Sequence, residues 1–491
     1  MKEKINKVII IGAGIAGLSS AVRMAARGYQ VEVFEATDKI GGKLNQFELN
    51  GYRFDAGPSL FTMPQYVTEL FTIAGKQGSD YFQYDSLDVI CNYFWEDGTR
   101  CSTYKDFDKT IKELSEKLFE SQQKLKEHFD DSALKYQLTG KTFLENTLHS
   151  FKTWLSLDVV KALTKLHKLD VLGTMHGVNQ KRFKNPKTIQ LFDRYATYNG
   201  SNPYKAPGLL NIIPHFEYGF GAYIPKKGMY EISESIYKLC IDLGVKFHLN
   251  TKVSNILKET NKVAGIQTVK GAVHKCDIVI SNMDAYYTYL HLLNQKEDAN
   301  DILKQERSSS ALIFYWGIKN TFKELDLHNI FFSNDYEHEF ACISKGEISN
   351  DPTIYINITS KYVQNDAPKG CENWFTMINV PYNKDQNWEL LIAHAKKNIL
   401  TKLSRILGRE IESLIVCEDI LDPRSIESKT MSYTGSLYGT SSNSKWAAFA
   451  RHPNQSPQYN NLFFIGGSVH PGGGVPLCLL SSKIVDDIIH G

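Results

Sequence analysis

Two glycine-rich segments at opposite ends of this 491-residue chain could bind phosphate groups. The first is 12–17, Gly-Ala-Gly-Ile-Ala-Gly, and the second is 466–476, Gly-Gly-Ser-Val-His-Pro-Gly-Gly-Gly-Val-Pro. Glycines let a pyrophosphate approach the backbone and its N–H groups. One such segment predicts only that some dinucleotide binds. Because two occur, one at each end, we expect a single long cofactor held from both sides, as FAD requires.

The first segment stands between a predicted strand and a predicted helix, as a phosphate-binding turn does. Residues 8–11 form an unbroken apolar run typical of a buried parallel strand, and 15–27 follow with helical periodicity. A second strand is predicted at 31–34. The helix N-terminus would then present free N–H groups and partial positive charge to the phosphates. An ordinary βαβ unit with chance glycines is the alternative.

The residue types in this segment fit that task one by one. Gly12 permits the tight turn, Gly14 admits the pyrophosphate, and Gly17 lets the helix pack closely on the strand. Glu35, followed by Ala36, ends the second strand, where a carboxylate accepts hydrogen bonds from the adenosine ribose. The other cofactor-binding residues predicted here are Ala13, Ile15 and Ala16.

A second glycine pair separates FAD from NAD. Residues 38–43, Asp-Lys-Ile-Gly-Gly-Lys, suit a loop folded back over the pyrophosphate, with Gly42 in the pair and Lys43 as a point charge. The segment 54–59, Phe-Asp-Ala-Gly-Pro-Ser, follows and adds Gly57, Pro58 and Ser59. Simple NAD domains have no use for these loops, so the sequence favours FAD.

Together these motifs resemble the carotenoid desaturase family, the bacterial phytoene desaturase group of the flavin amine oxidase-like superfamily, over essentially the whole chain. The most specific match is the ending 466–476, and further matches are 38–43, 54–59, 202–204, 222–228 and 281–284. Lys43 replaces the usual arginine, and 226–229 departs from an Arg-Gly-Gly-Thr-like stretch. The resemblance implies FAD contacts from Val253, Asn282, Met283, Gly466, Gly467, Gly474 and Val475.

Within that family, residues 192–200 resemble the branch that introduces a 3,4 double bond into carotenoids hydroxylated at C1. The resemblance implies hydride transfer from the carotenoid to flavin N5, with oxygen or a quinone as the final electron acceptor. A polar, tyrosine-rich stretch could bind the hydroxylated end through Arg194, Tyr195, Tyr198 and Asn199. A hydrogen-bonded turn before a helix is the alternative for this stretch, and phytoene desaturation is the alternative activity.

No protein-based catalytic dyad or triad can be recognised. His470, beside the predicted flavin-contacting glycines, is a candidate for proton transfer, although a histidine in such a loop is more often structural. Asp193 and Arg194 are candidates for orienting substrate. Two alternative functions remain for the chain, namely an amine oxidase-like enzyme and a non-catalytic prenyl-lipid carrier. The carrier has no need of the ribose carboxylate, and the aromatic pair and lysine of an amine oxidase cannot be placed.

Composition predicts a cytoplasmic protein that touches a membrane from one side. A formal net charge of +2 argues against nucleic acid as a partner, and eight cysteines without a CxxC pair indicate neither a disulfide scaffold nor a metal site. No apolar run is long enough to span a bilayer. The predicted substrate is nevertheless a membrane lipid, so we expect peripheral association.

A helical insertion at about 105–190 is the predicted membrane contact. Between 151 and 190 stand eight basic and two acidic residues, and leucines and one valine recur at helical spacing from Leu155 to Leu172. An ordinary surface helix packed on the core is the alternative.

The fold class expected is α/β (α+β overall), with interleaved domains. A Rossmann-type FAD-binding domain would comprise 1–79, 221–293 and 456–491. A mixed-sheet substrate domain would comprise 80–220 and 294–455, including the insertion.

Overall fold

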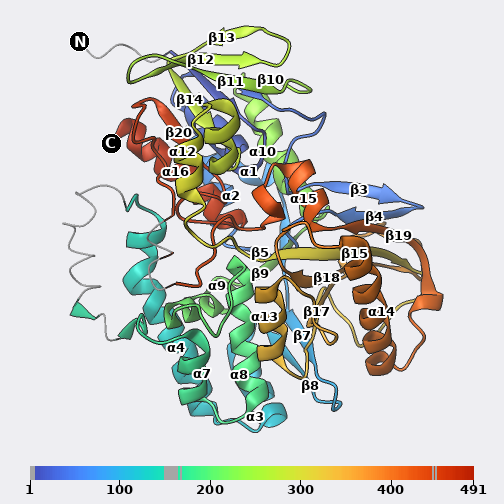
Figure 1. Cartoon of the computed structure of the whole chain (residues 1–491). Helices are drawn as coiled ribbons and strands as arrows, with labels where there is room; N and C mark the ends of the chain where they lie inside the picture. The colour runs from blue at the N-terminus through green and yellow to red at the C-terminus, as the bar shows by residue number, and fades with distance from the viewer. Residues whose placement is uncertain (1–5, 149–163, 166–167, 445–446, 448–450) are drawn as a thin grey trace.

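The computed structural model describes residues 6–148, 164–165, 168–444, 447 and 451–491. Its upper half in Figure 1 contains a five-stranded parallel sheet of order β10-β2-β1-β14-β20. The order reverses direction between β1 and β14, which makes the sheet a Rossmann-type arrangement with its ligand crevice at that point. The strands are β1 (Lys7–Ile11), β2 (Gln30–Phe34), β10 (Lys246–His248), β14 (Ile278–Ser281) and β20 (Leu462–Phe464).

Three helices pack around this sheet and hold the two chain ends together. They are α1 (Ile15–Ala26), α10 (Tyr230–Asp242) and α16 (Val475–His490). Helix α1 packs against both α10 and α16, and its small residues allow a buried hydrogen bond of 2.8 Å between Ser19 and Ser482. The strand and helix predictions for these segments are confirmed. The contact between α1 and α16 brings the first and last glycine-rich segments together.

Val253, which the family resemblance implies contacts FAD, lies outside the parallel sheet. Strand β10 ends at His248, and Asn250 has a left-handed backbone (φ 52°). Val253 begins β11 (Val253–Lys258), which belongs to a separate three-stranded sheet with β12 (Val263–Thr268) and β13 (Val273–Lys275).

A seven-stranded mixed sheet fills the lower right of Figure 1, in the order β19-β15-β18-β17-β16-β7-β8. Strands β16 and β7 are parallel, and the other pairs are antiparallel. Helix α14 (Trp388–Leu407) packs on this sheet in a core rich in tryptophan and isoleucine. The strands are β7 (Val89–Phe94), β8 (Arg100–Tyr104), β15 (Ser310–Ile318), β16 (His328–Phe331), β17 (Ile354–Asn357), β18 (Glu372–Val380) and β19 (Ile415–Leu421).

The insertion is helical in most of its described part. It contains α3 (Phe107–Leu118), α4 (Gln122–Thr139), α7 (Met175–Arg182) and α8 (Pro186–Asp193). Six residues of the predicted membrane contact lie outside the described residues, namely the apolar Leu155, Val159, Leu163 and Leu166 and the basic Lys152 and Lys161. At its other end the helical spacing is wrong, because 168–173 form turns. Asp170 has φ 50° and pairs at 2.9 Å with the fully buried Lys135, which breaks the helix there.

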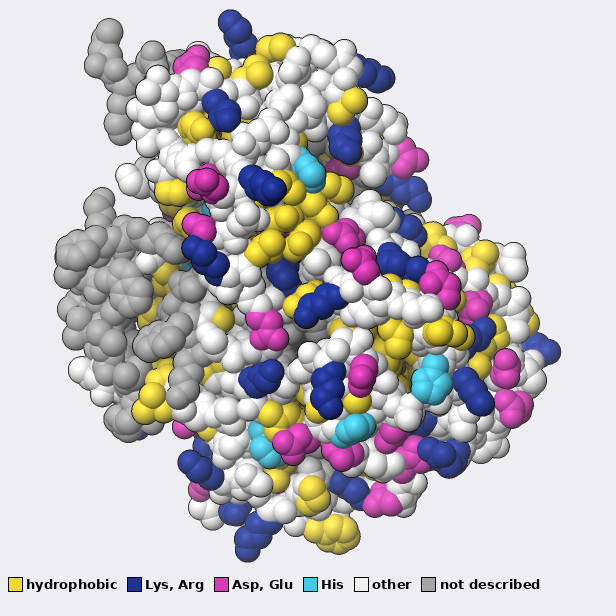
Figure 2. All heavy atoms as spheres, in the orientation of Figure 1, with side chains coloured by type: hydrophobic (Ala, Val, Ile, Leu, Met, Phe, Trp, Pro, Cys, Tyr) yellow, Lys and Arg dark blue, Asp and Glu magenta, His cyan; other side chains and the backbone are white. Residues whose placement is uncertain are grey.

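The remaining elements connect these layers. They are β3 (Gln46–Leu49), β4 (Tyr52–Asp55), β5 (Phe61–Thr62), β6 (Tyr84–Ser86), β9 (Ala222–Pro225), α2 (Gln65–Ile73), α9 (Pro214–Tyr218), α11 (Ala285–Tyr287), α12 (Lys296–Ile302), α13 (Tyr336–Lys345) and α15 (Pro423–Thr430). Figure 2 shows basic and acidic side chains interspersed over the visible face, in agreement with the small net charge. Within the described part of the chain, no helix is long and apolar enough to cross a membrane.

Candidate functional site

A cavity of about 1860 Å³ lies at the crevice of the parallel sheet and extends along the seven-stranded sheet. It is larger than the roughly 300–1,000 Å³ of drug-sized sites, so it has room for a dinucleotide and a second long ligand. Most of the predicted cofactor-binding residues line it: Gly12, Gly14, Ile15, Ala16, Glu35, Ala36, Gly42, Lys43, Gly57, Pro58, Ser59, Val253, Asn282, Met283, Gly466, Gly467, Gly474 and Val475.

The two other predicted residues, Ala13 and Gly17, shape the turn behind this lining. The Ala13 N–H donates to Glu35 Oε2 at 2.8 Å. A Cβ on Gly17 would stand 2.1 Å from the Gly12 carbonyl oxygen, so only glycine lets the helix approach the strand this closely. The Gly17 N–H donates to Asn282 Oδ1 at 3.1 Å, which ties the turn to the end of β14.

Glu35 is held rigidly at the end of β2. Its Oε2 accepts from Ala13, and its Oε1 accepts from both the backbone N–H and the hydroxyl of Thr37, each at 2.9 Å. A carboxylate offers about four lone-pair positions, so this one retains room for a further donor. The side chain is half-buried and lines the cavity, where a ribose hydroxyl could reach it.

Two helix N-termini open on the cavity without side-chain caps. Gly14 precedes α1 and Gly474 precedes α16, and neither helix start receives a side-chain cap hydrogen bond. Uncapped N–H groups and the helix dipole favour an anion. The loop of Gly41 and Gly42 folds back as predicted, since Gly41 forms a β-bridge with Gly14. The residues present therefore fit a cofactor with a pyrophosphate.

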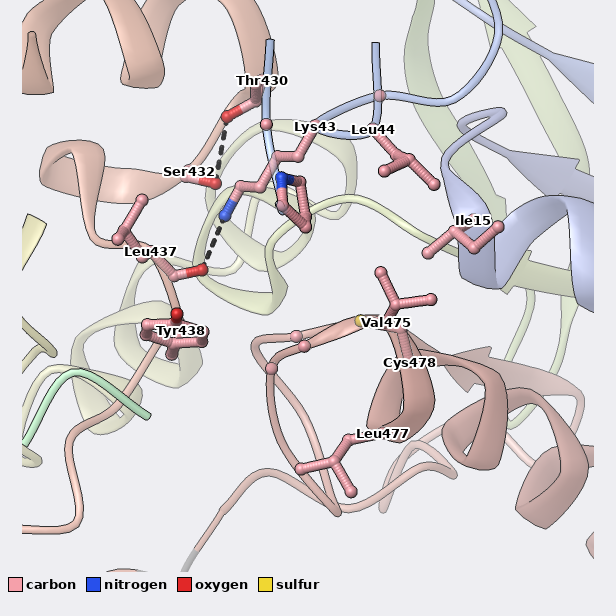
Figure 3. A pocket seen from close by; sticks show the side chains of 18 of the residues that line it. Ile15, Lys43, Leu44, Thr430, Ser432, Leu437, Tyr438, Val475, Leu477 and Cys478 are labelled. Carbon is pink, nitrogen blue, oxygen red and sulfur yellow. Dashed lines mark hydrogen bonds between the residues drawn. The ribbon is translucent and has the colours of Figure 1, made fainter. Parts of the chain in front are cut away.

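Two basic side chains that line the same cavity, Lys43 and Arg451, add positive potential to it. In Figure 3 the Lys43 amine reaches the Leu437 carbonyl, to which it donates at 2.9 Å. Arg451 donates to the carbonyls of Tyr438 at 3.0 Å and Thr440 at 2.8 Å. Burial lowers the pKa of Lys43 to about 8 and that of Arg451 to about 10. Sequence reasoning missed Arg451, because it belongs to no motif.

The seven-stranded sheet forms one wall of the cavity. Alternate residues of its strands face the space, including Ile313 and Tyr315 of β15, His328 and Ile330 of β16, and Tyr355 of β17. The opposite wall comes from the helical insertion and the segment after it, with Leu144, Leu148, Leu169, Leu210, Ile213 and Phe216. Leu172 also lines the cavity and is 81% exposed, so an opening lies beside the insertion.

One part of the cavity wall is polar, and it is called the polar end below. Arg194 Nη2 donates to the Tyr93 hydroxyl at 2.6 Å and forms an ion pair with Glu217 at 3.4 Å. Tyr198 also donates to Glu217. Arg194, Tyr198 and Asn199 line the cavity, as predicted for substrate contacts. Glu217 is 2% exposed, comes from α9, and was not singled out from the sequence.

Two predicted residues of this stretch do not line the cavity. Tyr195 is fully buried, and its hydroxyl donates to Glu217 at 2.7 Å. Asp193 hydrogen-bonds Asn179 at 2.8 Å and His176 at 2.6 Å, and this contact raises the pKa of His176. The 3-10 helix Arg194–Asn199 thus agrees with the hydrogen-bonded turn of the alternative interpretation, while substrate contacts by the residues that line the cavity stay a prediction.

His470 lines the cavity but is tied into the protein. Its Nε2 lies 2.9 Å from the Asn146 carbonyl, and its backbone N–H donates to His452. The side chain is 2% exposed. These contacts support the structural role for His470, which connects the C-terminal glycine loop to the helical insertion.

The chain belongs to the flavin-containing amine oxidoreductase family, whose model matches residues 15–485. It is therefore a flavin-dependent oxidoreductase with FAD as cofactor. It is 50% identical to a 1-hydroxycarotenoid 3,4-desaturase of Flavobacterium sp. (strain P99-3), over 99% of each chain. It is 33% identical to a 4,4'-diapolycopene oxygenase of Methylomonas sp, over 99% of this chain and 98% of that protein. The family resemblance stated from the motifs is confirmed.

The fold is also found among solved structures. A putrescine oxidase variant matches with a TM-score of 0.65 at 13% identity, over 99% of each chain. This similarity confirms the α/β fold of the amine oxidase type.

Proposed function

We propose that this protein introduces the 3,4 double bond into acyclic carotenoids that carry a hydroxyl at C1. The observation that carries the proposal is the cavity itself, an apolar space that adjoins the cofactor crevice and has the buried Arg194–Glu217 pair in its wall. The relative that is 50% identical over 99% of both chains supports the same substrate.

A C=C bond forms when two neighbouring saturated carbons lose a hydride and a proton. When bound, FAD supplies the two-electron hydride acceptor. The chain supplies the apolar walls, which exclude water and fix the register of the polyene. Positive charge that develops at an allylic carbon is delocalised over the polyene, so the protein has little acid–base work to do.

The polar residues of the crevice position the cofactor in this proposal. Glu35 accepts from the adenosine ribose, Val253 lies at the adenine, and the start of α1 faces the pyrophosphate. The start of α16, with Lys43 and Arg451, provides positive potential where negative charge develops during the reaction. The division into a FAD-binding domain and a substrate domain, with the boundaries given in the sequence analysis, is part of this proposal. Oxygen or a quinone is the proposed final electron acceptor.

The lipid substrate enters from a membrane surface. Leu172 at the opening is strongly exposed, and Lys165 and Lys168 beside it are exposed as well. An apolar side chain beside lysines is typical of an interface with anionic lipid. The protein thus associates peripherally with a membrane through this part of the insertion.

A competition between a 1-hydroxylated carotenoid and its non-hydroxylated parent tests the activity. The FAD-loaded protein receives both in detergent, and the products are separated by chromatography. We expect preferential 3,4-desaturation of the hydroxylated compound. Conversion of phytoene, or of the parent at the same rate, would refute the proposal.

A further inference from the structure

His328 stands at the polar end of the cavity with one ring nitrogen engaged. It lies on β16, on the sheet face that lines the cavity, and is 4% exposed. Its Nδ1 lies 2.7 Å from the Tyr355 hydroxyl and 3.3 Å from Asn357 Nδ2. The Tyr355 hydroxyl in turn lies 2.8 Å from the hydroxyl of Ser59, in the loop predicted to contact FAD.

These contacts fix the position of the proton on the ring. An amide nitrogen only donates, so Nδ1 accepts from Asn357, whose Nδ2 also donates to the Leu327 carbonyl at 3.1 Å. Burial and the charge of Arg194 lower the pKa of His328 to about 3, so the ring is neutral. A neutral imidazole that accepts at Nδ1 carries its hydrogen on Nε2.

Two buried donors at this end lack an acceptor. Among the described residues, no acceptor lies within hydrogen-bond distance of His328 Nε2 or of Arg194 Nε. Both residues line the cavity. The other guanidinium nitrogens of Arg194 donate to tyrosines and Glu217, so that cluster is largely satisfied within the protein. A buried donor without a partner is unfavourable, and an acceptor oxygen supplied by a ligand would satisfy it.

We infer that His328 is a specificity-determining residue, whose Nε2–H binds the oxygen of the substrate's terminal hydroxyl. Tyr355 and Asn357 orient the ring through Nδ1. A hydrocarbon end would leave this donor unpaired, whereas the hydroxylated end pairs it, so the site discriminates against the parent carotenoid. This inference rests on the proposed function and names the residue that reads the hydroxyl.

Two amide replacements separate the roles of the two ring nitrogens. In His328→Asn the amide reaches about as far as Nδ1, and in His328→Gln it reaches about as far as Nε2. We expect His328→Asn to lower the ratio of kcat/KM for hydroxylated over parent carotenoid about tenfold, the loss of one hydrogen bond with its buried partner. His328→Gln retains a donor at the Nε2 position and should keep most of the preference. His328→Phe should lose it.

His128 provides the matched control. It is fully buried with an unpartnered Nε2, yet it does not line the cavity. The same Asn and Gln changes there should leave the ratio unchanged. Flavin content and the thermal midpoint of each variant establish folding, and binding of both carotenoids to the oxidised protein, measured by quenching of flavin fluorescence, gives the same ratio without turnover.

The outcomes separate the two proposals. A wild type that prefers the hydroxylated carotenoid, with equal ratios for His328→Asn and wild type, overturns the role of His328 alone. Loss of preference in Gln and Asn variants alike would show that ring packing matters rather than the Nε2 donor. A wild type without preference refutes the proposed function, and the role of His328 with it.

Discussion

Replacing Glu35 with alanine should weaken FAD binding by a factor of about 10 to 150 while the protein stays folded. The carboxylate is already oriented by three donors, so a ribose hydroxyl meets an acceptor that needs no rearrangement. The one further charge-assisted hydrogen bond that it can accept is worth roughly 1.5–3 kcal/mol, which corresponds to that range of affinity. The variant also leaves the Ala13 N–H without its acceptor, which loosens the phosphate loop.

Titration of the apo-protein with FAD, followed by flavin fluorescence, measures this effect. Glu32→Ala is the matched control, because Glu32 lies on the same strand and pairs with Lys7 at 2.8 Å but does not line the cavity. Its FAD affinity should equal that of wild type. If Glu35→Ala binds FAD as tightly as wild type, Glu35 does not contact the ribose and the assignment of the crevice fails.

Three further predictions test the phosphate turn, the buried lysine and the membrane contact. Gly17→Ala should abolish FAD binding and lower the thermal midpoint, because its Cβ would meet the Gly12 carbonyl at 2.1 Å; normal binding would contradict the close helix–strand packing. Folding lowers the pKa of Lys43 to about 8. Between pH 8 and 10.5 the Lys43 amine is therefore protonated in the unfolded chain but largely neutral in the folded apo-protein. As pH rises from 8 towards 10.5, the apo-protein should therefore gain stability relative to Lys43→Met, whereas its affinity for FAD should fall. Lys43→Arg should retain its FAD affinity at pH 9. FAD binding to wild type that does not change with pH would exclude a role for the Lys43 charge. Replacing Lys165 and Lys168 by glutamate should weaken binding to anionic liposomes by about 1 kcal/mol per lysine, with activity in detergent unchanged. Lys397→Glu, on α14, is the control, and co-sedimentation with liposomes measures binding. If Lys397→Glu loses as much liposome binding as the other variants, the membrane contact lies elsewhere.

The cofactor half of the site could be predicted because its signals are local in sequence. Gly12, Gly14 and Glu35 occupy one strand–turn–helix–strand unit, where backbone conformation and spacing dictate the residue types. The fold followed from the same regularity, since parallel strands are apolar runs. The separation of Val253 from the parallel sheet depends on a left-handed turn at Asn250, which the sequence does not distinguish from an extended connection.

The substrate half could be predicted only in part, because its residues meet through tertiary packing. Arg194 was proposed from a polar stretch, but its partner Glu217 and neighbour His328 lie on other elements and belong to no motif. Within the stretch, periodicity could not tell which side chains face the cavity. Tyr195 and Tyr198 are one turn apart in their 3-10 helix, yet only Tyr198 lines the cavity.

The same packing explains why the polar end should discriminate. Arg194 and Glu217 form an ion pair and also hydrogen-bond three tyrosine hydroxyls. Most of their hydrogen-bonding groups are therefore already paired and are not available to a ligand. The donors of this group that lack a partner among the described residues are His328 Nε2 and Arg194 Nε. Selectivity for the hydroxylated carotenoid then comes from donors that the protein itself does not pair. A hydrocarbon end can fit the apolar walls equally well, but it leaves these donors without a hydrogen bond.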